Sequence, residues 1–142
     1  MERIVVGIDG SETACLALQW AAKEARLRQA SLEVVHAWTL PYVFGFPYTS
    51  ANFDPTSIED AARAVLDAAA ESVDTAGLVH PVERILVRDG AASAVLATAK
   101  GADLVVIGSR GLGGFTGLLL GSVSHQVAHH ATCPVVIIPR EA

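Results

Sequence analysis

A glycine-rich segment holds the residues of this chain that are best suited to bind a charged ligand. The segment Gly108–Ser124 reads GSRGLGGFTGLLLGSVS and contains half of the chain's twelve glycines. It follows an apolar run, Leu104–Ile107, and a helical pattern begins near Ser122. Glycine allows positive φ angles that expose successive backbone N–H groups, and a helix start adds unpaired N–H groups with partial positive charge. A strand, a glycine-rich loop and a helix start in this order favour a phosphate-binding site.

The glycine spacing excludes two common nucleotide-binding motifs. The P-loop requires Gly-Lys followed by Ser or Thr, and the chain contains no Gly-Lys pair. The dinucleotide-binding fingerprint requires a third glycine where Thr116 follows Gly111 and Gly113, and it belongs after a first strand. The spacing present is Gly108, two residues, Gly111, nine residues and Gly121, which indicates a phosphate site of another kind.

The rest of the chain alternates apolar strand patterns with helical patterns. Strands are expected at Arg3–Ile8, Leu32–Trp38, Val82–Val87, Asp103–Ile107 and Val135–Ile138, and helices at Glu12–Gln29, Ser57–Ala76, Asp89–Lys100 and Ser122–Ala131. This alternation predicts an α/β fold in which helices cover both faces of an open, parallel, five-stranded sheet. The connection over residues 39–55 is expected to be irregular.

Polarity suggests the order of the strands. The third strand, Val82–Val87, is the most polar and is therefore placed at an edge, which favours the order 3-2-1-4-5 over 2-1-3-4-5. In that order the first and fourth strands are adjacent and the chain reverses between them, so Asp9 should face Gly108 across a crevice. The fifth strand, Val135–Ile138, falls at the other edge, where its apolar residues need cover. We expect a homodimer through this strand.

Composition limits the class of protein. The length of 142 residues predicts one domain, residues 1–142, and a hydrophobic fraction of 51% with 18% charged residues predicts a folded chain. The N-terminus does not resemble a signal peptide and no run is long enough to span a membrane, so we expect a cytoplasmic protein. A net charge of −5 argues against nucleic-acid binding. Two cysteines, Cys15 and Cys133, do not suggest a disulfide framework.

Three parts of the chain together resemble the ATP-binding branch of the universal stress protein family. These parts are VGIDGSE near the N-terminus, the glycine spacing, and HATCPVV near the C-terminus, and they occur in the family's order over nearly the whole chain. The resemblance implies a Rossmann-like fold of the adenine nucleotide alpha hydrolase type. It also implies homodimers that form through the fifth strand.

The resemblance further implies a site for ATP, with AMP or ADP as alternatives and Mg²⁺ bound through the phosphates. The residues that it implies in binding are Gly7, Asp9, Ala37, Ile107, Gly108, Ser109, Arg110, Gly111, Gly121, Ser122 and Val123. Ala37 would contact adenine, and Asp9 would contact the ribose hydroxyls or a metal ion, beside a crevice that Gly7 keeps open. Gly121, Ser122 and Val123 would donate N–H groups to the phosphates, and Arg110 would pair with a phosphate.

The implied function is that of a nucleotide-dependent sensor or regulator in the stress response. No residue near the glycine-rich segment is suited to activate water, so no catalytic residue is predicted. The alternatives are a slow ATPase, or a protein-interaction module whose nucleotide stabilises the fold. His125 and His129 have the spacing of a zinc-binding helix, but no third ligand is evident and no metal site is predicted. The aromatic residues of 38–53 form either a packed cluster, a lid or a partner surface.

Overall fold

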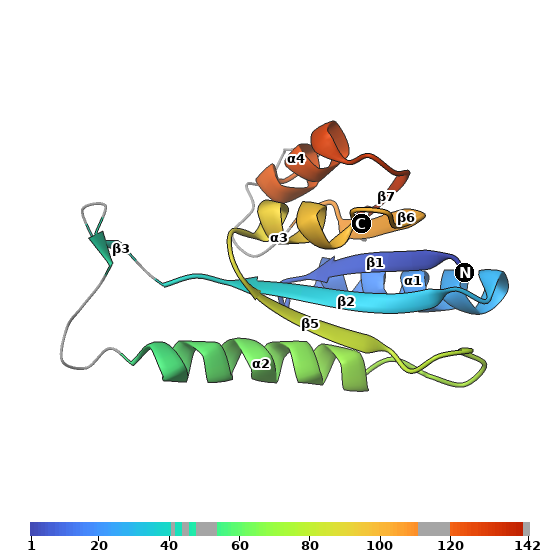
Figure 1. Ribbon diagram of the computed structural model, residues 1–142, viewed down its shortest axis with the longest axis horizontal. Helices are drawn as coiled ribbons and strands as arrows, with labels where there is room; N and C mark the ends of the chain where they lie inside the picture. The colour runs from blue at the N-terminus through green and yellow to red at the C-terminus, as the bar shows by residue number, and fades with distance from the viewer. Residues whose placement is uncertain (41, 44–45, 48–53, 111–119, 141–142) are drawn as a thin grey trace.

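A five-stranded parallel sheet forms the centre of the molecule in the computed structural model, which describes residues 1–40, 42–43, 46–47, 54–110 and 120–140. The strand order is β5-β2-β1-β6-β7, which confirms the predicted order 3-2-1-4-5 (Figure 1). The strands are β1 (Arg3–Ile8), β2 (Ser31–Trp38), β5 (Glu83–Arg88), β6 (Leu104–Gly108) and β7 (Val135–Ile138). The most polar strand, β5, lies at one edge and β7 at the other, as expected.

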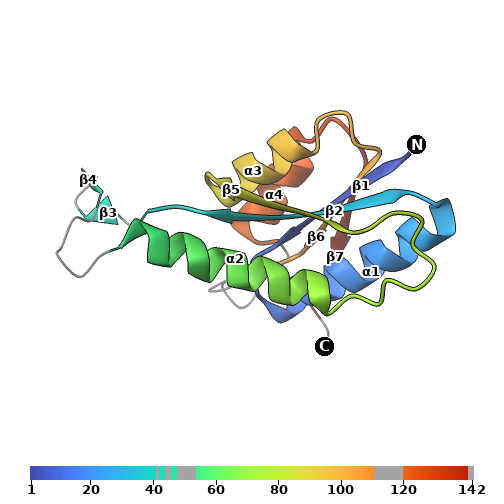
Figure 2. The ribbon, with the colours of Figure 1, turned by 60° about the horizontal axis from the view of Figure 1, so that its bottom comes forward.

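Two helices cover each face of the sheet. Helices α1 (Glu12–Arg28) and α2 (Pro55–Glu71) lie on one face, and α3 (Ala91–Thr98) and α4 (Ser122–His130) lie on the other, as Figure 2 shows. Alternate residues of the central strands therefore enter two different cores. The fully buried side chains of these strands are Ile4, Val6, Leu32, Val34 and Val106 on the α1–α2 face, and Val5, Val35 and Val105 on the α3–α4 face.

Helix α2 is offset from its predicted range of 57–76. Its first residue follows Asp54, whose carboxylate accepts the N–H of Thr56 at 3.0 Å, and a proline occupies the first helical turn. After the helix, the carboxylate of Asp74 accepts the N–H two residues further along at 3.0 Å. Such local side-chain bonds compete with helical ones, which explains why the helix ends before the predicted boundary.

The connection between β2 and α2 is not wholly irregular, in contrast to the prediction. It contains an antiparallel hairpin of two short strands, β3 (Tyr42–Val43) and β4 (Phe46–Pro47). Strands of two residues carry no periodic pattern that a sequence could reveal. Most of the other residues of the aromatic segment lie outside the described residues, so its three interpretations stay open.

Helix α3 begins later than predicted because Asp89 still belongs to the end of the sheet. The backbone N–H of Asp89 donates to the carbonyl of Trp38 at 3.0 Å, and the helix starts after Gly90. The other helices and strands agree with their predicted ranges within two residues.

The guanidinium of Arg3 joins three elements at the amino end of the sheet. It forms an ion pair with Glu33 of β2, in which Nη2 lies 3.2 Å from Oε1. Its Nη2 also donates to the carbonyl of Thr98 at 2.8 Å and its Nη1 to that of Lys100 at 3.1 Å, at the C-terminal end of α3. Glu33 is only 7% exposed, so its charge depends on this partner. The hydrogen bond that Arg3 donates to the Glu33 carboxylate in turn raises the pKa of Arg3.

We predict that Arg3→Ala lowers the free energy of unfolding by about 1–3 kcal/mol, because Glu33 loses its partner and the end of α3 loses two donors. Urea unfolding at neutral pH measures the change. Arg28→Ala is the matched control: Arg28 pairs with Glu24 at 2.7 Å on the exposed surface, and its loss should leave the midpoint nearly unchanged. Equal midpoints for the two variants would contradict the role assigned to Arg3.

Candidate functional site

The predicted site lies at the carboxyl edge of the sheet, where the chain reverses between β1 and β6. Strand β1 pairs with β2 on one side and with β6 on the other, so its end is the topological switch point. Asp9 directly follows β1, and Ser109 directly follows β6. The pairing of β1 with β2 ends at Ile8 and His36, so Ala37 lies one residue past the last pair. The structure thus brings Asp9, Ala37 and Ser109 to neighbouring strand ends.

The peptide of Ser109 holds both ends of the glycine-rich loop in place. Its N–H donates to the carbonyl of Ile138 in β7 at 2.8 Å. Its carbonyl accepts the N–H of Gly121 at 2.6 Å, so the loop starts and ends at the same point of the sheet. This bond corrects one expectation, because the Gly121 N–H is used within the protein and is not directed to a ligand. The proposed contact of Gly111 lies outside the described residues.

The start of α4 lies beside this point and presents backbone donors. Gly121 is the N-cap residue in an extended conformation, and among the described residues no side chain caps the helix. The first turn of α1, in contrast, is capped by Ser11, whose Oγ accepts the N–H of Ala14 at 3.2 Å. The N–H groups of Ser122 and Val123 belong to the first turn, where they have no acceptor within the helix. Together with the helix dipole they can bind an anion.

Two glycines at this edge are required by packing. A Cβ on Gly108 would lie 2.7 Å from Cγ2 of Thr13 and 3.1 Å from its backbone carbon, in the first turn of α1. A Cβ on Gly7 would lie 2.7 Å from Cγ2 of Val95 in α3. Gly7 therefore lets α3 approach β1, which corrects the expectation that it keeps space open for a ligand. The side chain of Ile107 is buried, so only its backbone could face a ligand.

The acidic residue at the end of β1 also shapes the chain around it. Oδ1 of Asp9 accepts the N–H of Ser11 at 2.9 Å, and Gly10 between them has a φ of 87°. This turn directs the chain into α1. The carboxylate thereby combines a structural role with a position at the switch point. Arg110 follows Ser109 at the same edge and is partly buried.

Residues that the sequence did not single out add polar groups to this edge. Nδ1 of His36 lies 2.9 Å from the carbonyl of Ile8, and the guanidinium of Arg88 lies over the ring of Trp38, 5.5 Å from its centre. His36 could have been noticed as a polar residue within the apolar run of β2. The contact of Arg88 with Trp38 depends on the register between β2 and β5 and has no signal in the sequence.

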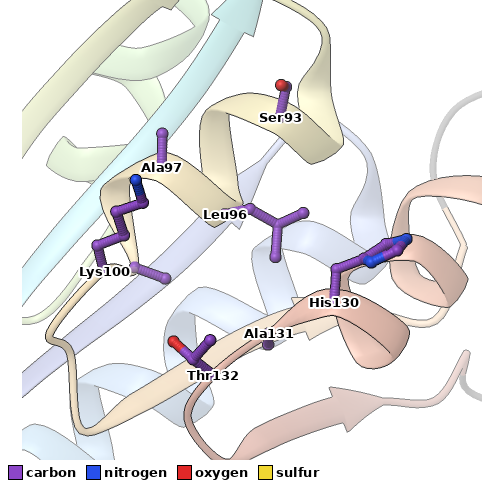
Figure 3. Close-up of a pocket in the computed structure, with 8 residues that line it drawn as sticks. Ser93, Leu96, Ala97, Lys100, His130, Ala131 and Thr132 are labelled. Carbon is purple, nitrogen blue, oxygen red and sulfur yellow. The ribbon is translucent and has the colours of Figure 1, made fainter.

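A separate pocket of about 300 Å³ lies between α3 and α4 (Figure 3). Its lining comes from both helices and the turn that follows α4: Ser93, Leu96, Ala97, Ala99, Lys100, His130, Ala131 and Thr132. Most of these residues lie toward the C-terminal ends of the helices, where carbonyl groups disfavour an anion. The pocket is therefore distinct from the edge at the start of α4.

Neither a metal cluster nor a membrane span is found in the part of the chain that the structure describes. No three His, Cys, Asp or Glu side chains there are placed to hold a metal ion. The rings of His125 and His129 stack with their centres 6.4 Å apart on the exposed surface of α4. None of the described helices is both long and apolar enough to cross a bilayer.

In comparisons with known proteins, this open α/β sheet with helices on both faces falls in a known family. The sequence pattern of the universal stress protein family matches residues 1–139, and the chain belongs to this family. The universal stress protein Rv2005c of Mycobacterium tuberculosis is 37% identical over 134 residues, which cover 94% of this chain and 44% of that protein. The chain thus spans about half the length of the curated relatives that it matches.

Solved structures of the family show the same fold. A universal stress protein in complex with cAMP is 26% identical, with a TM-score of 0.73 and coverage of 96% of both chains. A universal stress protein from Archaeoglobus fulgidus in complex with dAMP is 26% identical, with a TM-score of 0.70 and coverage of 97% of this chain and 98% of that one. Adenine nucleotides are thus the ligands in both of these relatives.

The packing of Gly108 generates a prediction. Gly108→Ala should lower the free energy of unfolding by about 1–3 kcal/mol, because the new methyl group overlaps Thr13. Adding Thr13→Ser removes the closest atom, Cγ2, and should recover part of the loss. A double-mutant cycle of urea unfolding midpoints measures this coupling. Additive effects of the two substitutions would show that the contact between α1 and β6 does not require the glycine.

Proposed function

We propose that this protein binds an adenine nucleotide at the carboxyl edge of its sheet. The observation that carries the proposal is the start of α4, which no side chain of the described residues caps and which the bond between Gly121 and Ser109 holds at the switch point. The cAMP and dAMP complexes of relatives support the choice of an adenine ligand. We propose ATP, with AMP or ADP as alternatives and Mg²⁺ bound through the phosphates.

In the proposed complex, the N–H groups of Ser122 and Val123 bind the phosphates together with the Ser122 hydroxyl, since these donors lie at the positive end of the α4 dipole. Arg110 adds a charge-assisted contact to a phosphate. The Asp9 carboxylate accepts hydrogen bonds from the ribose hydroxyls or holds the metal ion. The remaining residues contribute mainly backbone groups: Ala37 at the adenine, and Ile107, Gly108 and Gly111 at the ribose and phosphates. The N–H and carbonyl of Ser109 are already bonded within the protein, so Ser109 serves to hold the loop ends in place.

The proposed role of the bound nucleotide is regulatory. We infer a sensor in the stress response, and the sequence predicts a cytoplasmic location. Among the described residues no side chain at this edge is arranged as a base beside a nucleophile, which favours a binding role over a catalytic one. The two alternatives are a slow ATPase and an interaction module with a structural nucleotide. Steady ATP hydrolysis that is lost in Asp9→Ala would favour the first, and a partner bound equally with and without ATP would favour the second.

A proline substitution at Ser122 tests the proposed contact between its backbone N–H and a phosphate. Ser122 is the first residue of α4, where proline fits a helix, and Gly121 has a ψ of 172° that accepts a following proline. Ser122→Pro should fold normally but weaken ATP binding by about tenfold or more, since it removes the N–H and the hydroxyl. Ser122→Ala, which removes the hydroxyl alone, should cause a smaller loss. Calorimetry measures both affinities.

Mass spectrometry of small molecules released from the purified protein accompanies this test. We expect an adenine nucleotide from the wild-type protein and less of it from Ser122→Pro. The proposal fails if the wild-type protein neither contains nor binds an adenine nucleotide. It also fails at this contact if Ser122→Pro and Ser122→Ala bind ATP equally well.

We also propose that two copies pair through β7. The carbonyl of Pro134, just before this strand, accepts the N–H of Val105 in β6 at 3.0 Å, and the carbonyl of Ile138 accepts the N–H of Ser109, just after β6, at 2.8 Å. Backbone groups alternate in direction along a strand, so those of residues 135 and 137 face outward. The strand is apolar throughout and partly exposed. A second copy of the same edge would pair these groups and cover the apolar side chains.

The pairing predicts a sharp effect of Ile137→Pro. Proline removes an outward N–H without breaking the bonds to β6, so the variant should fold but be monomeric at micromolar concentration. Ile137→Val is the matched control, because it keeps the N–H and should remain dimeric. Sedimentation velocity distinguishes the two states. A wild-type protein that sediments as a monomer would refute the pairing.

A further inference from the structure

The hydroxyl of Ser124 is buried and donates a hydrogen bond to a residue outside its own helix. Ser124 is the third residue of α4 and is 2% exposed. Its Oγ lies 2.9 Å from the carbonyl of Ser109, fifteen residues earlier in the chain, and 3.1 Å from the carbonyl of Gly121. A buried hydroxyl without an acceptor is costly, and here two acceptors lie within reach of its one proton.

The Ser109 carbonyl that receives this bond is a fixed point of the fold. Ser109 is 5% exposed, and its N–H is bonded to Ile138 in β7. The same carbonyl accepts the N–H of Gly121 at 2.6 Å. One oxygen of the sheet edge therefore binds the first turn of α4 twice, through the backbone of its N-cap and through the side chain of Ser124.

These two hydrogen bonds to the Ser109 carbonyl determine the orientation of the first turn of α4. The N–H of Gly121 and the hydroxyl of Ser124 lie on either side of Ser122 and Val123 in the chain, so their attachment orients the two donors between them. A misplacement of a binding group by about 1 Å is enough to reduce its effect greatly. The Ser124 hydroxyl itself is turned into the protein, toward Ser109, and does not face a ligand.

We propose that Ser124 is a positioning residue for the phosphate-binding start of α4, and this inference rests on the proposed nucleotide site. Its hydroxyl bonds the first turn of the helix to the end of β6, so that the N–H groups of Ser122 and Val123 are held in place before the phosphates arrive. Because its hydroxyl is turned toward Ser109, Ser124 acts on the nucleotide only through the position of these N–H groups. Its loss should reduce phosphate binding alone and spare the recognition of adenine and ribose.

The test compares ATP with adenosine, which lacks phosphates. Ser124→Ala should weaken ATP binding by about tenfold and change adenosine binding by less than about twofold. Ser124→Thr keeps the hydroxyl and should restore most of the ATP affinity. Thr98→Ala is the matched control, because it removes a hydroxyl bonded to a carbonyl of its own helix α3, at 2.8 Å and far from the site. Equal losses for ATP and adenosine in Ser124→Ala would overturn the proposal.

Hydrogen exchange without nucleotide separates this inference from the proposed function. In Ser124→Ala the amide of Gly121 should exchange at least about fivefold faster than in the wild-type protein, because its bond to Ser109 loses the support of the second bond. Ser124→Thr should restore the slow exchange. Unchanged protection of Gly121 in Ser124→Ala overturns the positioning role, even if the wild-type protein binds ATP. A wild-type protein that binds neither ATP, ADP nor AMP refutes the nucleotide site, whatever the exchange rates show.

Discussion

The burial of both faces of the central strands is the constraint on which the other features of this protein depend. Strands β1 and β6 have α1 and α2 on one side and α3 and α4 on the other, so their side chains enter one apolar core or the other. Little room remains there for a polar group. Polar side chains that could bind a ligand are consequently placed at the ends of the strands. Asp9 and Ser109 are the first residues after the adjacent strands β1 and β6.

The same constraint explains why glycines and small polar residues gather at the carboxyl edge. Helices that cover a sheet closely must approach its backbone, and at Gly7 and Gly108 they leave no space for a Cβ. Glycine there permits helix packing, whereas Gly121 serves the loop by placing its N–H against Ser109. Glycines that look alike in the sequence thus have different roles: Gly7 and Gly108 allow close packing, and Gly121 fixes the end of the loop.

Much of the fold could be predicted from the sequence because it rests on contrasts of polarity. The segment Val82–Val87 is more polar than the other strands, and this contrast was enough to place β5 at an edge of the sheet. The strand order that follows puts the switch point between β1 and β6. The ends of α2 were missed because they depend on single side-chain bonds from Asp54 and Asp74. The glycine spacing predicts where a ligand would bind, but it could not show that Gly7 faces Val95. Nor could it show that the Gly121 N–H is already bonded, since that contact exists only when the loop ends meet.

The position of β1 in the middle of the sheet has a consequence for how the chain is assembled. Ile4 pairs with Leu104, and Arg3 donates its backbone N–H to Asp103, one hundred residues away along the chain. Within this chain, β1 is synthesised before its partner β6, so one of its two edges stays unpaired until about a hundred further residues have been made. Contacts of such long range slow folding, and an apolar strand with one open edge is prone to pair wrongly while it waits. The early packing of α1 and β2 against β1 would protect β1 during synthesis, until β6 has been made and pairs with its free edge.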